Sequence, residues 1–491
     1  MPKKFYIATS IPYANGAPHM GHPLDPLYAD VLARYYRSNG YDVFFLVGLD
    51  ENGQTVYNKA KCAGVPIEDF VEEIRSKFIQ MHEKINDTYD GFIRTTDEKN
   101  HWPTAQEIWK RAQDNGDIYK KNYKGLYCVG CEEFKLERDL VDGKCPDHLT
   151  KPEEIEEENY FFALSKYQDF LLDLFDKNKD FVYPQNKYNE AYQIIKGGLE
   201  DVSISRPKTR LPWGVPVPGD DDHVMYVWFD ALTNYLSGIG FTSDKKKFEK
   251  YWPADIQIVG KDNNKWHSIL WPAMLKSAGL EIPKKILVHS YVLAKGNVKM
   301  SKTIGNVVDP IEMIDKYGAD AFRYFILSKI PIDTDGAFDE DHFREVYNSE
   351  LSNKLGNLLQ RTISMINRYD VKIPKSEKKE LRDALLDNLS KTKMTLREQV
   401  NEETELLRFG NALSLIWTHG VDVLNEYFEK NKPWEIAKSN PEKAAKVLQD
   451  VHGSLLVIAG LLVPFMPETS EKMKEQLKTL KPEPLFPRLE K

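Results

Sequence analysis

The sequence predicts an α/β domain built on a parallel sheet, interrupted by an insertion and followed by an α-helical domain. Short apolar runs alternate with helical patterns near the amino terminus, and this alternation returns after residue 254. Beyond about residue 339 no strand-like pattern of any length remains, and amphipathic stretches continue to the end of the chain.

The amino-terminal segments form the first half of the predicted sheet. Lys4–Ser10 is typical of a strand, Pro23–Gly40 of a helix that ends in glycine, and Asp42–Gly53 of a second strand that runs into a polar turn. Functional groups in parallel sheets gather at the carboxyl ends of the strands. We therefore expect Ser10–His22 and Asp50–Gln54 to lie at the same edge of the sheet.

The insertion is expected between the two halves of the sheet. From about Asn115 to Pro212 the alternation stops, and this stretch holds three of the four cysteines and the acidic run Glu153–Asn159. Strand-like segments resume at Asp255–Asn263 and Lys285–Ala294, with a helix between them. The predicted domains are residues 1–114, 115–212, 213–294, 295–350 and 351–491.

Length and composition indicate a soluble protein with several domains. A chain of 491 residues exceeds one ordinary core, and 41 % hydrophobic with 29 % charged residues is usual for a globular protein. The net charge of −8 argues against nucleic-acid binding over the whole surface, but it is compatible with a local basic face. The few cysteines, the lack of a secretory signal pattern and the absence of an apolar run of about 18 residues predict a cytoplasmic location. The most apolar stretch, Gly453–Phe465, is predicted to be a core helix.

Two histidines, His19 and His22, lie directly before the first predicted helix. A helix start presents unpaired N–H groups and the positive end of the helix dipole, so phosphate is a favoured ligand there. Gly21 has no side chain, which allows a base or a sugar to approach the backbone. The alternative is that both histidines only cap the helix or pack against it.

Two lysines follow the last predicted strand. Val298–Asn306 holds Lys299 and Lys302 in a loop rich in Gly, Ser and Thr. Two ammonium groups in such a loop suit a clamp on the charge that develops on a polyphosphate during group transfer. Taken alone, the same stretch is typical of a solvated turn.

The insertion contains a candidate metal site. Cys128, Cys131, Cys145 and His148 form two pairs with two residues inside each pair, which is a standard ligand set for tetrahedral Zn²⁺. A glycine inside one pair and a proline inside the other argue against the alternative that these are only reduced structural cysteines. Because four protein ligands leave no open position, the predicted zinc is structural. Cys62 lies far away in the sequence and is expected to be a buried small residue.

The two phosphate-binding candidates resemble the HIGH and KMSKS signatures of class I aminoacyl-tRNA synthetases, here HMGH at His19–His22 and KMSKT at Lys299–Thr303. Further segments over nearly the whole chain are similar to the methionyl-tRNA synthetase family: PYANG at Pro12–Gly16, YVWFDAL at Tyr226–Leu232, VGKDN at Val259–Asn263 and NKPW at Asn431–Trp434. The resemblance implies a Rossmann-like parallel-sheet catalytic domain with an inserted zinc-binding connective domain and a C-terminal α-helical anticodon-binding bundle.

The resemblance also implies a ligase that joins methionine to tRNA for translation initiation and elongation. ATP with Mg²⁺ and L-methionine would form methionyl-adenylate and pyrophosphate, and the methionyl group would pass to tRNA(Met), including initiator tRNA. By resemblance, the residues that stabilise the phosphates are His19, His22, Lys299 and Lys302. The residues implied to bind ATP are Tyr13, Asn15, Gly21, His22, Gly260, Asp262 and Lys302.

A methionine pocket is implied by the same resemblance. Asp50 would hold the α-ammonium group, and shape with soft aromatic contacts would select the thioether, which offers little hydrogen bonding. Asn52, Leu232 and Asn263 depart from residues common in the family, and they are expected to alter the pocket without changing the amino acid chosen. The implied pocket residues are Ile11, Tyr13, Asp50, Trp228, Ala231, Tyr235, Trp266 and His267.

The helical domain is implied to bind the CAU anticodon. Asn357 and Arg361 are four residues apart on one predicted helix, and Trp434 follows a proline. An aromatic plane with amide and guanidinium groups suits the reading of single-stranded RNA. The alternatives are ordinary packing for Trp434 and a solvated helix face for the other two residues.

Two other functions stay open at this stage. Other class I synthetases share both signatures, but the isoleucine, valine and leucine enzymes need a larger insertion than about 100 residues, and the cysteine enzyme differs around PYANG. A non-catalytic RNA-binding paralogue is disfavoured by the intact histidines and lysines of both signatures. The end of the chain soon after the helical domain predicts a monomer.

Overall fold

A computed structural model describes residues 2–129, 133–135, 137, 140–146, 149–298, 300, 308–373 and 394–490. The chain forms two compact units. The first contains residues 1–83 and 87–289, and the second contains residues 84–86 and 290–491.

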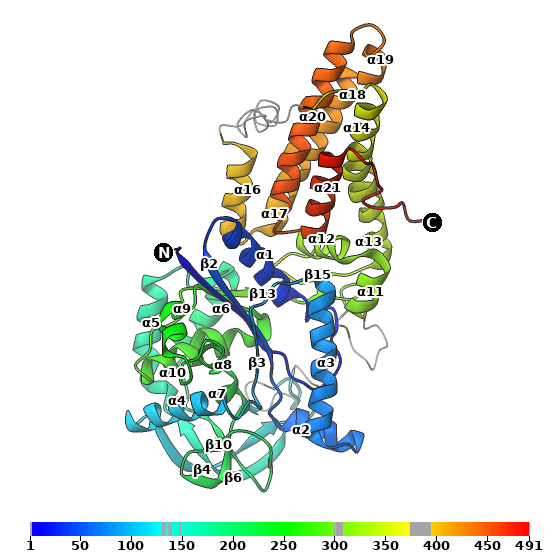
Figure 1. Cartoon of the computed structure of the whole chain (residues 1–491). Helices are drawn as coiled ribbons and strands as arrows, with labels where there is room; N and C mark the ends of the chain where they lie inside the picture. Colours follow the sequence, from blue (N-terminus) through cyan, green and yellow to red (C-terminus); the bar gives the residue numbers. More distant parts are fainter. Residues whose placement is uncertain are drawn as a thin grey trace. The chain divides into compact units, whose positions relative to one another are not determined.

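The first unit is built on a six-stranded sheet in the order β3-β2-β1-β12-β13-β7, in which all neighbouring strands are parallel. Its strands β2, β3 and β13 are labelled in Figure 1. The direction of winding reverses at β1, because β2 and β12 lie on opposite sides of it. Ligands of such sheets bind at the carboxyl ends of the strands where the winding reverses. The strands are β1 (Lys4–Thr9), β2 (Asp42–Leu49), β3 (Gly91–Arg94), β7 (Val182–Tyr183), β12 (Ile256–Gly260) and β13 (Ile286–His289).

Helices connect these strands and bury apolar faces against the sheet. The first of them, α1 (Leu24–Ser38), has ten buried residues and ends before Gly40, whose φ of 80° suits glycine. The predictions for the first strand, first helix and second strand are confirmed within a few residues. The remaining helices are α2 (Gln54–Ala63), α3 (Ile67–Ile85), α4 (Trp102–Asp114), η2 (Leu164–Tyr167), α5 (Gln168–Lys177), α6 (Gln185–Lys196), α7 (Val227–Ala231), α8 (Asn234–Ser237), α9 (Lys245–Tyr251), η3 (Lys261–Asn263), η4 (Trp266–Leu270) and α10 (Trp271–Ser277).

Two smaller antiparallel sheets belong to the same unit. One has the order β5-β4-β6-β8 and the other the order β10-β11-β9. The predicted insertion is not separate along its whole length, because its segment β7 joins the edge of the main sheet beside β13. The bounds are β4 (Ile118–Cys128), β5 (Glu133–Lys135), β6 (Glu153–Phe162), β8 (Val202–Ser203), β9 (Ser205–Pro207), β10 (Pro216–Val217) and β11 (Asp220–Met225).

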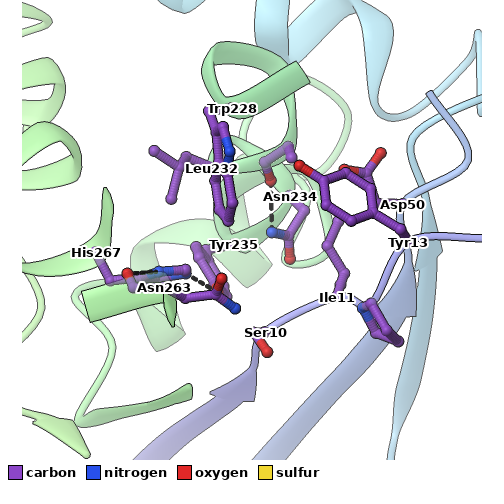
Figure 2. Close-up of a pocket in the computed structure, with 12 residues that line it drawn as sticks. Ser10, Ile11, Tyr13, Asp50, Trp228, Leu232, Asn234, Tyr235, Asn263 and His267 are labelled. Carbon is purple, nitrogen blue, oxygen red and sulfur yellow. Dashed lines mark hydrogen bonds between the residues drawn. The ribbon is translucent and has the colours of Figure 1, made fainter. Parts of the chain in front are cut away.

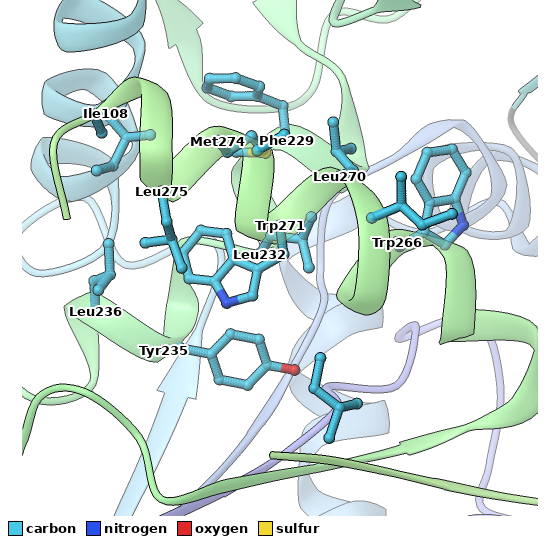
Figure 3. Packing of buried hydrophobic residues seen from close by; sticks show 14 of the residues in the cluster. Ile108, Phe229, Leu232, Tyr235, Leu236, Trp266, Leu270, Trp271, Met274 and Leu275 are labelled. Atoms are coloured by element: carbon cyan, nitrogen blue, oxygen red, sulfur yellow. The ribbon is translucent and has the colours of Figure 1, made fainter. Parts of the chain in front are cut away.

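A continuous apolar cluster forms the core of the first unit and supports the helices that carry later site residues. Tyr235 of α8 packs against Trp271 of α10, with ring centroids 6.0 Å apart (Figure 3). The hydroxyl of Tyr6 in β1 donates a hydrogen bond of 2.7 Å to the backbone oxygen of Tyr235. The sheet therefore fixes the position of α8 directly.

The second unit is mainly helical, which confirms the predicted helical carboxyl-terminal region. The predicted strand Lys285–Ala294 is divided: β13 belongs to the first unit, and β14 (Val292–Leu293) pairs with β15 (Gly336–Ala337) in the second. The change of partner occurs at Ser290, whose N–H donates to the oxygen of Ile332. The helices are α11 (Pro310–Tyr317), α12 (Ala319–Lys329), α13 (Glu340–Val346), η5 (Tyr347–Gly356), α14 (Asn357–Arg368), α16 (Leu396–Glu405), α17 (Phe409–Leu415), η6 (Ile416–Val421), α18 (Asp422–Asn431), α19 (Pro433–Ile436), α20 (Pro441–Leu461) and α21 (Pro467–Thr479).

The longest helix of the second unit, α20, is a core helix. Among the described residues it alone has the length and apolarity of a membrane-crossing helix, but 67 % of its most apolar window is buried within the fold. It includes most of the predicted apolar stretch Gly453–Phe465. The observed burial is typical of a helix surrounded by other helices.

Cys62 is exposed on α2, so the expectation that it is buried is wrong. The helix turns only Val56 and Ala60 toward the interior. Cys62 follows Ala60 by two residues, which places it on a different face of the helix.

Gly48 of β2 generates a test of the close packing between the sheet and the loop that follows β1. A methyl group added at Gly48 would lie 2.6 Å from Cγ2 of Ile93 and 2.9 Å from Cγ2 of Ile11. We expect Gly48→Ala to lower the free energy of unfolding by about 1–3 kcal/mol, because the neighbouring strand must move. Urea denaturation followed by circular dichroism measures the change.

Gly460→Ala in α20 is the control for this substitution, because a methyl group there would meet no atom within 4 Å. Alanine at a helical position is expected to raise stability by up to about 1 kcal/mol. Equal effects of the two substitutions would contradict the close packing of Gly48.

Candidate active site

The loop after β1 is fastened to both neighbouring strand ends by backbone hydrogen bonds. The N–H of Ser10 donates to the oxygen of Ile258 at 2.7 Å, on the β12 side. On the β2 side, Asp50 N–H donates to Pro12 oxygen at 2.8 Å, and Ala14 N–H donates to Asp50 oxygen at 2.7 Å. The side chains of this loop therefore stand in fixed positions above the point where the winding of the sheet reverses.

A small cavity opens at this point (Figure 2). Its volume is about 70 Å³, several times the roughly 10–15 Å³ that one water molecule needs. Residues that directly follow β1 and β2 surround it, together with residues in or next to α7, α8, η3 and η4. They are Ser10, Ile11, Pro12, Tyr13, Asp50, Trp228, Ala231, Leu232, Asn234, Tyr235, Asn263 and His267.

Asp50 places a carboxylate in the wall of this cavity. The residue is 3 % exposed, and its Oδ1 accepts hydrogen bonds from Thr95 Oγ1 at 3.1 Å and from the N–H of Asn52 at 3.2 Å. Thr95 is itself held, because its Oγ1 accepts a hydrogen bond from the N–H of Glu51 at 2.9 Å. A buried carboxylate with a fixed orientation suits a cationic partner, because an opposite charge compensates its loss of hydration.

His267 and Tyr235 form an uncharged part of the same wall. The hydroxyl of Tyr235 bonds to Nε2 of His267 at 2.7 Å, and Nδ1 of His267 donates to the oxygen of Asn263 at 3.0 Å. Because that oxygen only accepts, Nδ1 carries the proton, and Nε2 accepts from the hydroxyl. Burial lowers the pKa of His267 to about 4 and raises the pKa of Tyr235 far above its usual value. At neutral pH this part of the cavity therefore carries no charge.

Trp266 supports the cavity from behind. It stacks on Trp228 with ring centroids 5.0 Å apart and an angle of 14° between the ring planes. Trp228 lines the small cavity and meets Tyr13 edge to face at 6.2 Å, whereas Trp266 lines a second, larger cavity of about 730 Å³. Seven of the eight residues expected to bind methionine thus surround one space, and Trp266 lies outside it in contact with Trp228.

His19 and His22 form a compact pair before α1. The N–H of His19 donates to Nδ1 of His22 at 2.9 Å, and the N–H of Gly21 donates to Nδ1 of His19 at 3.1 Å. The two rings lie 3.8 Å apart. Because both Nδ1 atoms accept hydrogen bonds, the neutral rings carry their protons on Nε2. Two Nε2–H donors and a helix start suit an anion such as phosphate.

The first turn of α1 lies at the carboxyl edge of the sheet beside the cavity. Its Asp25 accepts a hydrogen bond from the hydroxyl of Ser10 and contacts Nε2 of His289, the last residue of β13. Gly260 pairs in register with His289, and Asp262 follows in η3. Of the residues expected to bind ATP, those that the structure describes are thus in the loop after β1, at the end of β12 or in η3.

Several cavity residues carried no signal of their own in the sequence. Ser10 lies in the segment Ser10–His22, Pro12 begins the motif PYANG, and Leu232 and Asn263 were noted as departures from the family pattern. Asn234 was missed, although it precedes Tyr235 and stands in the cavity wall. Thr95 was also missed, because its contact with Asp50 joins residues 45 positions apart in the chain.

Some predicted site residues lie outside the described part of the chain. Lys299, Lys302, Cys131 and His148 belong to this group. The other two predicted zinc ligands, Cys128 and Cys145, are buried, and neither forms a disulfide with a described cysteine. Within the described residues, no group of three or more His, Cys, Asp or Glu side chains is arranged to hold a metal ion.

In the second unit, two of the three residues expected to read RNA are brought together. The guanidinium of Arg361 in α14 lies 5.2 Å from the ring of Trp434 and 4.9 Å from the ring of Phe428. Its Nη1 donates to Oε1 of Glu429 at 2.7 Å. Asn357 is exposed one helical turn earlier on α14.

Comparison with known proteins identifies the family. A family model described as tRNA synthetases class I (M) matches residues 5–153 and 148–363, and a model of the anticodon binding domain of methionyl tRNA ligase matches residues 373–487. The chain belongs to the methionyl class I tRNA synthetases. The match covers both units, so the family resemblance of the two signature motifs extends to the whole fold.

Individual relatives agree with this family. The methionine–tRNA ligase of Caldanaerobacter subterraneus subsp. tengcongensis is 43 % identical over 97 % of this chain and 74 % of its own length. That of Thermotoga maritima is 42 % identical over 96 % of this chain and 74 % of its own. The Mycobacterium tuberculosis methionyl-tRNA synthetase in complex with methionyl-adenylate has a TM-score of 0.91 and 37 % identity, covering 99 % of this chain and 100 % of that one.

The buried state of His267 generates a prediction about acid stability. Its pKa is about 4 in the folded chain, below the ordinary value of 6.5 that applies after unfolding. As the pH falls, His267 therefore binds a proton in the unfolded chain before it does so in the folded chain. The contribution of the neutral ring to the free energy of unfolding is fully present above pH 6.5 and decreases as the pH falls toward 4. Relative to His267→Gln, the wild-type chain should lose about 2 kcal/mol more between pH 7 and pH 5.

Urea titrations at the two pH values measure this difference. His101, whose pKa burial also lowers to about 4, is present in both proteins and cancels from the comparison. Equal losses in the wild type and in His267→Gln would contradict a neutral, buried His267.

Proposed function

We propose that the small cavity binds L-methionine and that the adjoining pair His19 and His22 binds the phosphates of ATP. The chain is a methionine–tRNA ligase, which activates methionine with ATP and transfers the methionyl group to tRNA. One observation carries the assignment of the site: a buried carboxylate, Asp50, shares a small cavity with the uncharged Tyr235–His267 pair. An amino acid with an ammonium group and a neutral side chain is complementary to this distribution of charge.

Activation requires the carboxylate of methionine to attack the α-phosphorus of ATP in line with the departing pyrophosphate. Catalysis of such a step is mainly positioning and stabilisation of charge. Asp50 would hold the α-ammonium group, and Trp228, Ala231 and Ile11 would enclose the side chain. His19 and His22 would donate their Nε2–H groups to phosphate oxygens, beside the positive end of α1.

ATP is proposed to enter with Mg²⁺, as class I synthetases generally use it. Tyr13, Asn15, Gly21, Gly260 and Asp262 are the further candidates for contacts with the nucleotide. Lys299 and Lys302 lie outside the described residues, and their proposed role is to stabilise the charge on the departing pyrophosphate.

The test of this proposal is ATP–pyrophosphate exchange with each of the twenty amino acids. We expect exchange that depends on methionine, and we expect His22→Ala to lower its kcat about 100-fold or more, because a donor to the reacting phosphates is lost. The KM for methionine should change little, since His22 does not line the small cavity.

His342→Asn is the matched control, because His342 is half-exposed in the second unit. It should leave kcat unchanged. A wild-type protein without methionine-dependent exchange would refute the proposed function, and an unaffected kcat in His22→Ala would refute the role of the histidine pair.

For the second unit we propose that Asn357, Arg361 and Trp434 read the anticodon of tRNA(Met), including initiator tRNA. The support is the stack of a guanidinium on an indole beside an exposed amide, which offers one plane for a base and several donors for base edges.

The monomeric state and the cytoplasmic location stay predictions from the sequence.

Substitutions in this group should affect tRNA charging without affecting activation. We expect Arg361→Ala and Trp434→Ala each to lower kcat/KM for tRNA about 10- to 100-fold, because a stacked base is worth about 1–3 kcal/mol. ATP–pyrophosphate exchange without tRNA should be unchanged. Arg368→Ala, at the exposed end of the same helix, is the control. An equal loss in exchange and charging would mean that the substitutions act on folding.

We also propose one structural Zn²⁺ in the insertion, held by Cys128, Cys131, Cys145 and His148. Cys128 and Cys145 fit this role, because both are buried thiols without a disulfide among the described cysteines. A thiolate-rich set with one imidazole is a standard environment for structural zinc. The ion would stabilise the fold of the insertion and would take no part in the reaction.

Metal analysis tests this proposal. We expect purified wild-type protein to contain one zinc per chain, and we expect Cys128→Ser to lose most of it, because serine is a poor zinc ligand. Cys62→Ser should keep the full zinc content, since Cys62 is exposed on α2. Full zinc content in Cys128→Ser would refute the ligand assignment.

A further inference from the structure

Asn234 lines the small cavity, and its amide oxygen has no hydrogen-bond partner among the described residues. The residue is 1 % exposed and lines the cavity. Its Nδ2 donates a hydrogen bond of 2.6 Å to the backbone oxygen of Ala231, and within the described part of the chain its Oδ1 has no hydrogen-bond partner. Figure 2 shows the amide nitrogen turned to this backbone oxygen and the amide oxygen turned the other way.

The orientation of this amide is fixed by chemistry. If the amide were flipped, its oxygen would face the oxygen of Ala231 at 2.6 Å, and two acceptors would repel each other. The nitrogen is therefore the atom bonded to Ala231, and the oxygen is turned away from that backbone oxygen. A buried acceptor without a donor costs about 1–3 kcal/mol, so a ligand group that supplies an N–H would relieve this cost on binding.

The ligand proposed for this cavity has only one group that can supply the donor. The thioether and the carboxylate of methionine only accept hydrogen bonds, whereas the α-ammonium group has three N–H donors. Asp50 lines the same cavity. One carboxylate cannot accept all three N–H bonds of an ammonium group, because these bonds point in different tetrahedral directions. This step rests on the proposed binding of methionine in the cavity.

We propose that Oδ1 of Asn234 is a second acceptor for the α-ammonium group, beside the carboxylate of Asp50. Asn234 is then a residue that selects α-amino acids over otherwise similar carboxylic acids. An amide suits this position better than a carboxylate, because a second buried negative charge near Asp50 would favour protonation of one of the two groups. The amide adds an acceptor while the occupied cavity stays neutral.

The test compares methionine with 4-(methylthio)butanoate, which has the same carbon chain, thioether and carboxylate but no amine. Both are measured in ATP–pyrophosphate exchange, methionine by its KM and the analogue by its inhibition constant. We expect Asn234→Leu to raise the KM for methionine about tenfold or more, the effect of losing one hydrogen bond to a charged group. The inhibition constant of the analogue should stay within about twofold, because it lacks the ammonium group.

A second variant, Asn234→Ala, separates this role from a purely structural one. The smaller side chain leaves room for a water molecule, which supplies a substitute acceptor, so the KM for methionine should rise less than in Asn234→Leu. If Asn234→Leu does not fold, Asn234→Ala decides the question by the same comparison of ligands. Equal weakening of methionine and analogue, or no weakening of methionine, would overturn the proposal.

Asn159 provides the matched control. It is fully buried outside the cavity, its Nδ2 donates to Glu157 at 2.8 Å, and its Oδ1 has no hydrogen-bond partner in the described part of the chain. Asn159→Leu therefore makes the same chemical change elsewhere and should leave both constants unchanged.

Asp50→Asn separates a failure of this proposal from a failure of the proposed function. If Asp50→Asn weakens methionine selectively and the Asn234 variants do not, the cavity binds methionine and only the role of Asn234 is refuted. If the wild-type protein supports no methionine-dependent exchange, the proposed function itself is refuted.

Discussion

The parallel pairing of β1 with β2 on one side and β12 on the other is the constraint on which the candidate active site depends. The backbone bonds of Ser10 to Ile258 and of Ala14 to Asp50 continue this pairing past the ends of the strands. These hydrogen bonds restrict the polar loop after β1 to one conformation, whereas an unbonded loop would have many. A shift of one residue in the register would turn Asp50 to the opposite face of the sheet and remove the carboxylate from the cavity.

Burial, rather than the kind of residue alone, determines the distribution of charge in the cavity. His267 belongs to a residue type that is often charged in mildly acidic solution, but complete burial lowers its pKa to about 4 and keeps the ring neutral. Asp50 is also buried, but Thr95 and the backbone of Asn52 donate hydrogen bonds to its carboxylate. The same cavity can therefore combine one anionic position with an uncharged wall.

The sequence was sufficient for features that depend on local patterns. Lys4–Ser10 matched β1 because a strand buried on both faces is a short continuous apolar run, and Pro23–Gly40 matched α1 because a helix with one buried face leaves a repeat of about 3.6 residues. The break in Lys285–Ala294 was not predictable, because a continuous apolar run does not indicate that its two halves pair in different sheets. The two-residue strand β7 is too short for any periodicity.

Prediction of the site had the same limit. The family motifs located part of the cavity lining, because some of its residues lie in quoted segments such as Pro12–Gly16 and Tyr226–Leu232. Thr95 and the orientation of Asn234 depend on contacts formed only in the folded chain. Trp266 was expected in the methionine pocket, but it lies behind Trp228 and outside the cavity, a position that depends on the turn of η4.

The stacked Arg361 has a consequence for how the helical unit meets a flexible partner. An arginine on the surface normally loses much of its rotational freedom when it is fixed by a ligand, at a cost of about 0.5–1.5 kcal/mol for each such side chain. Arg361 already lies against the rings of Phe428 and Trp434, and its guanidinium donates a hydrogen bond to the carboxylate of Glu429. Most of its ordering therefore takes place when the chain folds. A single-stranded nucleic acid that docks there bears mainly the entropy loss of its own nucleotides.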